Sequence, residues 1–132
     1  PHGEAGVVAI FSQRLLGRRN MLIFARRQIG DPGCVRDYVY VDDVVAANLA
    51  VIDGNHDGVF NVGTGEPRTT QDVLSALAAH VDGEPDVTPS PPRPGDLERS
   101  VLDPSKLSSL GWKPSVSFAD GIARTLAWFR DR

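Results

Sequence analysis

Apolar positions recur at helical spacing in several stretches of the chain. Residues 7–16 carry them on one side of a predicted helix, and Gly17 follows as a C-cap. The same pattern predicts helices from Asp42 to Gly54 and from Thr69 to Val81. Ser117 with Asp120 opens a last helix, whose apolar face holds Phe118, Ile122, Leu126 and Phe129.

Short apolar runs lie between these helices and predict strands. Residues 21–24 and 59–62 indicate buried strands, while residues 35–41 and 100–103 look extended. The proline-rich stretch 84–95 predicts a loop, and Asp103-Pro104 opens a short helix that ends at Gly111. Short strands that alternate with helices predict an α/β or α+β fold with about five helices.

Composition narrows the class of protein. A chain of 132 residues with 41% apolar and 23% charged residues suits one soluble domain, residues 1–132. The net charge is −3 with no basic stripe, so we expect no nucleic-acid partner. No apolar run approaches the length that spans a membrane. Cys34 is the only cysteine, which indicates a reducing cytoplasm. The three histidines lack metal-ligand spacing, so no metal is expected.

Residues 91–96 (PPRPGD) form the most informative stretch, because three prolines and a glycine restrict the backbone around Arg93 and Asp96. An arginine on such a loop can clamp a phosphate, and a carboxylate can accept bonds from sugar hydroxyls. The alternative is a rigid surface turn with two solvated charges. Arg36 and Asp37 pose a similar choice, between a ligand contact and a local ion pair, and Tyr38 could be an ordinary strand aromatic.

Five segments in order resemble the C-terminal, substrate-binding lobe of the extended short-chain dehydrogenase/reductase family, with UDP-glucose 4-epimerases as the most similar branch. They are residues 1–11 (PHGEAGVVAIF), 34–43 (CVRDYVYVDD), 60–65 (FNVGTG), 91–96 and 110–114 (LGWKP). The chain also starts at Pro1 without an initiator methionine, which indicates a piece cut from a longer protein.

The resemblance implies a role for each matching residue. Arg36 and Arg93 would grip the nucleotide diphosphate, Asp96 would bond the ribose hydroxyls, and Tyr38 would lie beside the diphosphate or the sugar. The strand before the RDY motif would recognise the uracil edge through main-chain groups, which places that role on Leu22, Ile23 and Phe24.

The family's reaction also needs a glycine-rich turn for NAD and a Tyr-x-x-x-Lys pair, and neither occurs in this sequence. Gly63-Thr64-Gly65 is too short for a dinucleotide fingerprint and reads as a tight turn. The resemblance therefore implies that an N-terminal Rossmann lobe would bind NAD. This chain alone would bind none, and no catalytic residue is assigned to it.

By the same resemblance, the full-length protein would interconvert UDP-glucose and UDP-galactose through bound NAD. It would be a cytoplasmic homodimer. Without the Rossmann lobe, the first helix should expose apolar side chains at Val7, Ile10 and Phe11. Three other readings stay open: the lobe of a nucleotide-sugar dehydratase or decarboxylase, a stand-alone nucleotide-sugar binding module, and a plain interaction domain.

Overall fold

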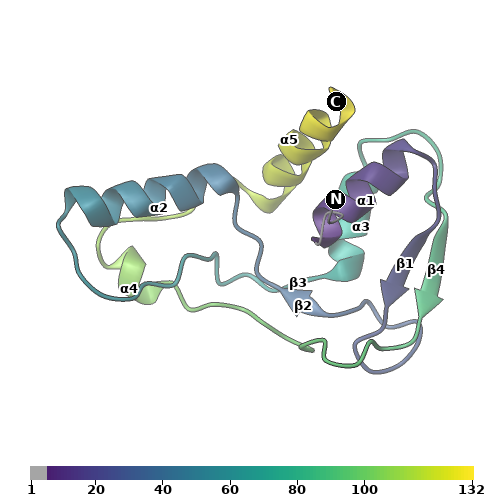
Figure 1. Ribbon diagram of the computed structural model, residues 1–132, viewed down its shortest axis with the longest axis horizontal. Coiled ribbons are helices and arrows are strands. Elements are labelled where there is room, and N and C mark those ends of the chain that lie inside the picture. The colour runs from purple at the N-terminus through teal and green to yellow at the C-terminus, as the bar shows by residue number, and fades with distance from the viewer. Residues whose placement is uncertain (1–5) are drawn as a thin grey trace.

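The computed structural model describes residues 6–132, which form five helices and four short strands (Figure 1). The predicted mixed architecture with about five helices is confirmed. The element bounds are α1 Val7–Leu16, β1 Met21–Phe24, β2 Val35–Arg36, α2 Val41–Asp53, β3 Arg68–Thr69, α3 Thr70–Ala78, β4 Val87–Ser90, α4 Ser105–Ser108 and α5 Phe118–Arg130.

The larger hydrophobic core joins three helices to a parallel strand pair. Helices α1, α3 and α5 pack on one another, and β1 lies beside β4 at the same end of the molecule (Figure 1). The strands run in register from Met21 opposite Val87 to Phe24 opposite Ser90. Burial of apolar surface is the main force that holds such a core together. Its buried members are Phe11, Leu15, Met21, Ile23, Val73, Leu74, Leu77, Ile122 and Leu126.

A smaller core lies at the other end of the molecule, between α2 and α4 (Figure 1). Its buried members are Ala47, Leu107 and Trp112. The indole Nε1 of Trp112 donates to the backbone oxygen of Asp43 at 3.1 Å. The Asp43 side chain is itself buried, and it accepts from Ser115 N at 2.9 Å, Ser115 Oγ at 2.7 Å and Val116 N at 3.1 Å. The loop before α5 is therefore fixed to the first turn of α2.

Local signals placed the N-terminal ends of the helices well, whereas α3 ends at Ala78 rather than at Val81. Thr69 and Asp72 form the predicted capping box, with Asp72 N donating to Thr69 Oγ1 and Thr69 N donating to the Asp72 carboxylate. Ser117 also caps α5, because its Oγ accepts from Asp120 N at 3.1 Å. Helix α4 differs at both ends, because Pro104 is its N-cap rather than its first residue and the helix ends at Ser108 rather than at Gly111. Asp103 still accepts from the Ser105 N–H at 2.9 Å.

Two strand predictions and one loop prediction were wrong in part or in whole. Residues 59–62 form no strand; Val59 is 85% exposed, and no strand in the described range pairs with this segment. The extended segment 35–41 keeps strand pairing only at Val35–Arg36, because its partner β3 has just two residues. The proline-rich loop instead contains β4, which tolerates Pro89 because it pairs with β1 alone and lies at an edge.

The exposed apolar surface lies on a different helix from the one predicted. Phe11 on α1 is only 3% exposed, and Val7 and Ile10 are half-buried. Of the ten large apolar side chains that are exposed in the described residues, four instead form a stripe along α2: Val41, Val45, Leu49 and Ile52. In the part of the chain that the structure describes, no helix combines the length and the apolar character needed to cross a bilayer.

Gly33 shapes the turn that carries the chain from β1 to β2. Its φ is +83°, and a Cβ there would lie 2.7 Å from Thr70 Cβ and 3.2 Å from the Phe24 backbone oxygen. Gly30 has a similar φ of +93° but open space around it. We expect Gly33→Ala to lower the free energy of unfolding by about 2 kcal/mol and Gly30→Ala by about 1 kcal/mol, because only the first adds a clash to the backbone strain. Equal losses in urea denaturation would contradict this account.

Candidate functional site

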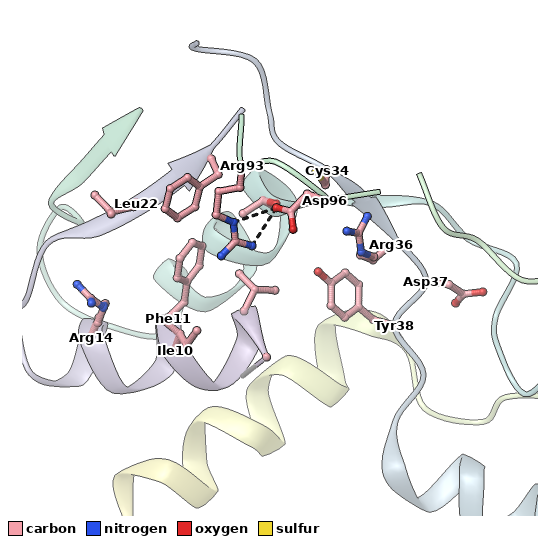
Figure 2. A pocket seen from close by; sticks show the side chains of 14 residues that line it. Ile10, Phe11, Arg14, Leu22, Cys34, Arg36, Asp37, Tyr38, Arg93 and Asp96 are labelled. Atoms are coloured by element: carbon pink, nitrogen blue, oxygen red, sulfur yellow. Dashed lines mark hydrogen bonds and ion pairs between the residues drawn. The ribbon is translucent and has the colours of Figure 1, made fainter. Parts of the chain in front are cut away.

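A pocket of about 650 Å³ opens between α1, the free edge of β1, β2 and the loop of residues 91–96 (Figure 2). Six of the seven side chains predicted from the sequence line it: Leu22, Phe24, Arg36, Tyr38, Arg93 and Asp96. The seventh, Ile23, points into the larger core and is 5% exposed. The fold therefore brings together residues from segments up to 74 positions apart in the sequence (96 minus 22).

Arg93 and Asp96 face each other across a tight turn in the middle of the pocket (Figure 2). Asp96 Oδ2 lies 2.9 Å from both Nε and Nη2 of Arg93. The Arg93 guanidinium also stacks over Phe24, 4.5 Å from the centroid of the ring. The Arg93 side chain is 58% exposed and the Asp96 side chain 30%, and an ion pair with this access to solvent stabilises a fold by only about 0–1 kcal/mol. A ligand phosphate could therefore replace the carboxylate at little energetic cost.

Arg36 ties the far side of that loop to β2. Its Nη1 donates to Val35 O at 2.8 Å and to Leu97 O at 2.7 Å. These bonds use one nitrogen of a guanidinium that carries five N–H donors. The ion pairs found in residues 6–132 do not include Arg36, so the reading of a local pair with Asp37 is wrong. Figure 2 shows the Arg36 head group directed into the same pocket as Arg93.

Asp37 is a structural anchor that the sequence did not reveal. Its carboxylate accepts from Thr64 N at 2.9 Å, Thr64 Oγ1 at 2.6 Å, Gly65 N at 2.9 Å and Leu102 N at 3.3 Å. Burial raises the pKa of Asp37, but these hydrogen bonds outweigh it and hold the pKa below its usual value. The anchor fixes the chain between Arg36 and Tyr38, so both neighbours keep their place at the pocket.

The same hydrogen bonds occupy the backbone N–H groups of the segment Gly63-Thr64-Gly65. A phosphate loop would direct its backbone N–H groups at a ligand. Here the Thr64 and Gly65 N–H groups already donate to Asp37, and Gly65 has a φ of +75°. The chain bends at Gly63, and the interpretation as a tight turn stays a prediction. Nothing in this turn fits the pyrophosphate of a dinucleotide.

Tyr38 stands beside Arg36 at one end of the pocket (Figure 2). Its ring packs on Phe118, with 5.8 Å between the centroids. Burial raises the pKa of the phenol, and the nearby Arg36 charge reverses only part of that effect. The hydroxyl is therefore protonated at neutral pH and can donate a hydrogen bond to an anionic or sugar oxygen.

The main chain of β1 offers unpaired groups on the pocket side. Met21 N donates to Asp86 O at 2.8 Å and Ala25 N donates to Ser90 O at 2.9 Å, so odd-numbered residues face β4. Successive residues of a strand direct their main-chain groups to opposite edges. Leu22 and Phe24 thus present N–H and C=O groups at the free edge, whereas Ile23 faces β4.

Several lining residues were not predicted to contact the ligand, among them Ile10, Phe11 and Arg14 of α1 and Cys34. The sequence did hold a signal for the lining residues of α1, since positions 7, 10, 11 and 14 share one face of a helix.

Across residues 6–132, no group of three or more His, Cys, Asp or Glu side chains is arranged to hold a metal ion.

Anchoring carboxylates make the fold sensitive to acid. The pKa values of Asp31, Asp37 and Asp43 are all lowered, because backbone and hydroxyl hydrogen bonds outweigh the effect of burial. A group whose pKa falls on folding stabilises the protein above its unfolded pKa and loses that contribution as the pH drops through the folded value. We expect the contribution of these groups to hold from pH 7 to about pH 5 and to fall below about pH 4. Urea denaturation at pH 6, 5, 4 and 3 measures this, and unchanged stability down to pH 3 would contradict it.

Known proteins resemble this chain over its whole length. Residues 10–125 match the protein family described as GDP-mannose 4,6 dehydratase. A UDP-glucose 4-epimerase of Mycolicibacterium smegmatis is 46% identical over all of this chain and 41% of its own length. The crystal structure of the Thermus thermophilus UDP-glucose 4-epimerase with NAD is 54% identical, with a TM-score of 0.90 over 98% of this chain and 42% of that one.

The Thermotoga maritima UDP-glucose 4-epimerase, solved with UDP-glucose, is 43% identical, with a TM-score of 0.80 over 99% of this chain and 41% of that one. The chain thus spans about two fifths of the length of these relatives. The family match covers most of the chain, and the structural matches reproduce the fold that carries the pocket. The chain therefore belongs to the GDP-mannose 4,6 dehydratase family of extended short-chain dehydrogenases/reductases.

Proposed function

We propose that this chain is the nucleotide-sugar binding part of an NAD-dependent UDP-sugar 4-epimerase that interconverts UDP-glucose and UDP-galactose. The observation that carries the proposal is one pocket lined by two arginines, a carboxylate, a tyrosine and an unpaired strand edge. In this proposal residues 1–132 form a single substrate-binding lobe. The activity belongs to a protein as long as the relatives, of which this chain matches about two fifths.

Each part of the pocket suits one part of the ligand. Arg36 and Arg93 approach from separate segments, so together they can neutralise two phosphates where one side chain could not. Asp96 would leave its pair with Arg93 and accept from the ribose hydroxyls. The Tyr38 hydroxyl would donate to the diphosphate or the sugar. The free main-chain groups of β1 match the alternating donors and acceptors of a uracil edge.

The residues of this chain do not fit NAD. A dinucleotide needs a glycine-rich turn at a helix N-terminus, and the one Gly-x-Gly turn here gives its N–H groups to Asp37. We therefore assign no step of hydride or proton transfer to residues of this chain. We expect the isolated chain to retain no NAD and to convert no UDP-galactose.

A second candidate is the corresponding lobe of a nucleotide-sugar dehydratase or decarboxylase. The matched family is described by a dehydratase, and the same diphosphate pocket would serve either reaction. A non-catalytic nucleotide-sugar module would use it as well. For the epimerase, a role in galactose metabolism, a place in the cytoplasm and a homodimeric full-length protein complete the proposal.

A calorimetric titration of the 132-residue chain with UDP, UDP-glucose and dTDP-glucose tests the binding role. We expect weak, saturable binding with a preference for the uridine ligands. Absence of saturable binding for all three would contradict the proposal. A coupled assay of the purified chain with UDP-galactose and NAD is the second test. Measurable conversion would show that residues of this chain do catalyse the reaction, contrary to the proposal.

A further inference from the structure

Arg14 occupies one end of the pocket and has no part in the binding roles proposed above. It lies in the last turn of α1, at the pocket wall. Its Nη1 donates to Asn20 O at 2.6 Å. Asn20 Nδ2 in turn donates to Asp86 Oδ1 at 3.0 Å and to Thr88 Oγ1 at 2.9 Å. The guanidinium is therefore held from outside the pocket, by a chain of bonds that reaches the segment around β4.

The Arg14 charge has no carboxylate partner among the ion pairs of residues 6–132. The bond to Asn20 O uses one of its five N–H donors. Its neighbours along the pocket wall, Ile10 and Leu22, are apolar (Figure 2). A positioned donor group next to apolar walls is suited to a planar ligand with an acceptor at its edge.

The order of side chains along the pocket indicates which part of a nucleotide reaches Arg14. Figure 2 shows Arg36 and Tyr38 at one end, Arg93 and Asp96 in the middle, and Leu22 with Arg14 at the other end. With a diphosphate between Arg36 and Arg93 and a ribose at Asp96, as the proposed function has it, the base extends toward Leu22 and Arg14.

We propose that Arg14 selects the base: it donates to a ring carbonyl of uracil or thymine and discriminates against cytosine. This rests on the proposed function. Uracil and thymine carry a carbonyl acceptor at the position where cytosine carries an amino donor. Arginine has donors only, so cytosine would place a donor against a donor and leave both without a partner. The free N–H and C=O groups of Leu22 read the rest of the base edge but can pair with either pyrimidine.

The test is a set of NMR titrations of the ¹⁵N-labelled chain with UDP and with CDP. In the parent chain, UDP should bind at least about 10-fold more tightly than CDP, the size expected for one charge-assisted hydrogen bond. Arg14→Met should weaken UDP binding by about 10-fold and leave CDP binding within about 2-fold, which removes the preference. Arg14→Lys keeps a charged donor and should retain part of the preference. Arg18→Met removes an exposed arginine four positions away that does not line the pocket, and it should change neither affinity.

Different outcomes separate this inference from the function on which it rests. If the parent binds UDP and CDP equally, or if Arg14→Met weakens both ligands by the same factor in a chain that keeps its dispersed spectrum, base selection by Arg14 is wrong and the nucleotide site stands. If the parent binds neither nucleotide, the proposed function itself fails.

Discussion

Replacing Asp43 with alanine is expected to lower the free energy of unfolding by about 3 kcal/mol. The Asp43 carboxylate is 2% exposed and accepts three hydrogen bonds from Ser115 and Val116. Alanine would leave those donors without partners, and each unsatisfied buried group costs about 1–3 kcal/mol. Asp43→Asn keeps the shape and one acceptor oxygen, so it should lose only about half as much. Urea denaturation followed by circular dichroism measures both.

Asp42 provides the matched control for that prediction. It belongs to the same first turn of α2, carries the same charge and is exposed. Asp42→Ala removes only a favourable interaction with the helix N-terminus, about 0.5 kcal/mol. A loss at Asp43 no larger than the loss at Asp42 would show that the contacts with Ser115 and Val116 do not stabilise the fold.

Replacing Arg93 with alanine is expected to weaken UDP binding by about 10- to 100-fold, the effect of losing a charge-assisted bond to a desolvated phosphate. Its ion pair with Asp96 is exposed, so the same change should alter the free energy of unfolding by less than about 1 kcal/mol. Loss of binding without loss of stability is the signature of a ligand contact. Calorimetry and urea denaturation on the same variant measure the two quantities.

Arg27 is the control for Arg93. It also forms an exposed ion pair, with Glu98 at 2.7 Å, but it does not line the pocket. Arg27→Ala removes the same charge from the chain and should leave UDP affinity unchanged. If both variants weaken binding equally, the effect is one of overall charge, and Arg93 has no specific role.

Local interactions explain why much of the fold could be predicted. Helical periodicity predicts both α1 and α5. The C-cap Gly17 marks the end of α1 and the N-cap Ser117 marks the start of α5, so each signal lies next to the helix that it bounds. The pocket residues could be anticipated for a related reason. Arg93 and Asp96 belong to one short motif, so their proximity follows from the local sequence. Only the position of that motif opposite β1 and β2 depends on the tertiary fold.

Long-range interactions explain what could not be predicted. Asp37 receives its hydrogen bonds from Thr64, 27 positions away, and Asp43 from Ser115, 72 positions away, so neither anchor leaves a local pattern. Strand identity has the same origin. Residues 87–90 form β4 because they pair with β1. Residues 59–62 have side chains suited to a strand, but no strand among the described residues pairs with them.

We propose that this chain holds a nucleotide diphosphate between Arg36 and Arg93. A titration of the ¹⁵N-labelled chain with UDP, followed by two-dimensional NMR, tests it most directly, because each residue reports its own environment. We expect saturable shifts of the Arg93 and Arg36 side-chain Nε–H signals and of the backbone amides of Leu22, Phe24 and Asp96, with none along α2. Shifts confined to the stripe at Val41, Val45, Leu49 and Ile52, or no saturable shift at all, would contradict it.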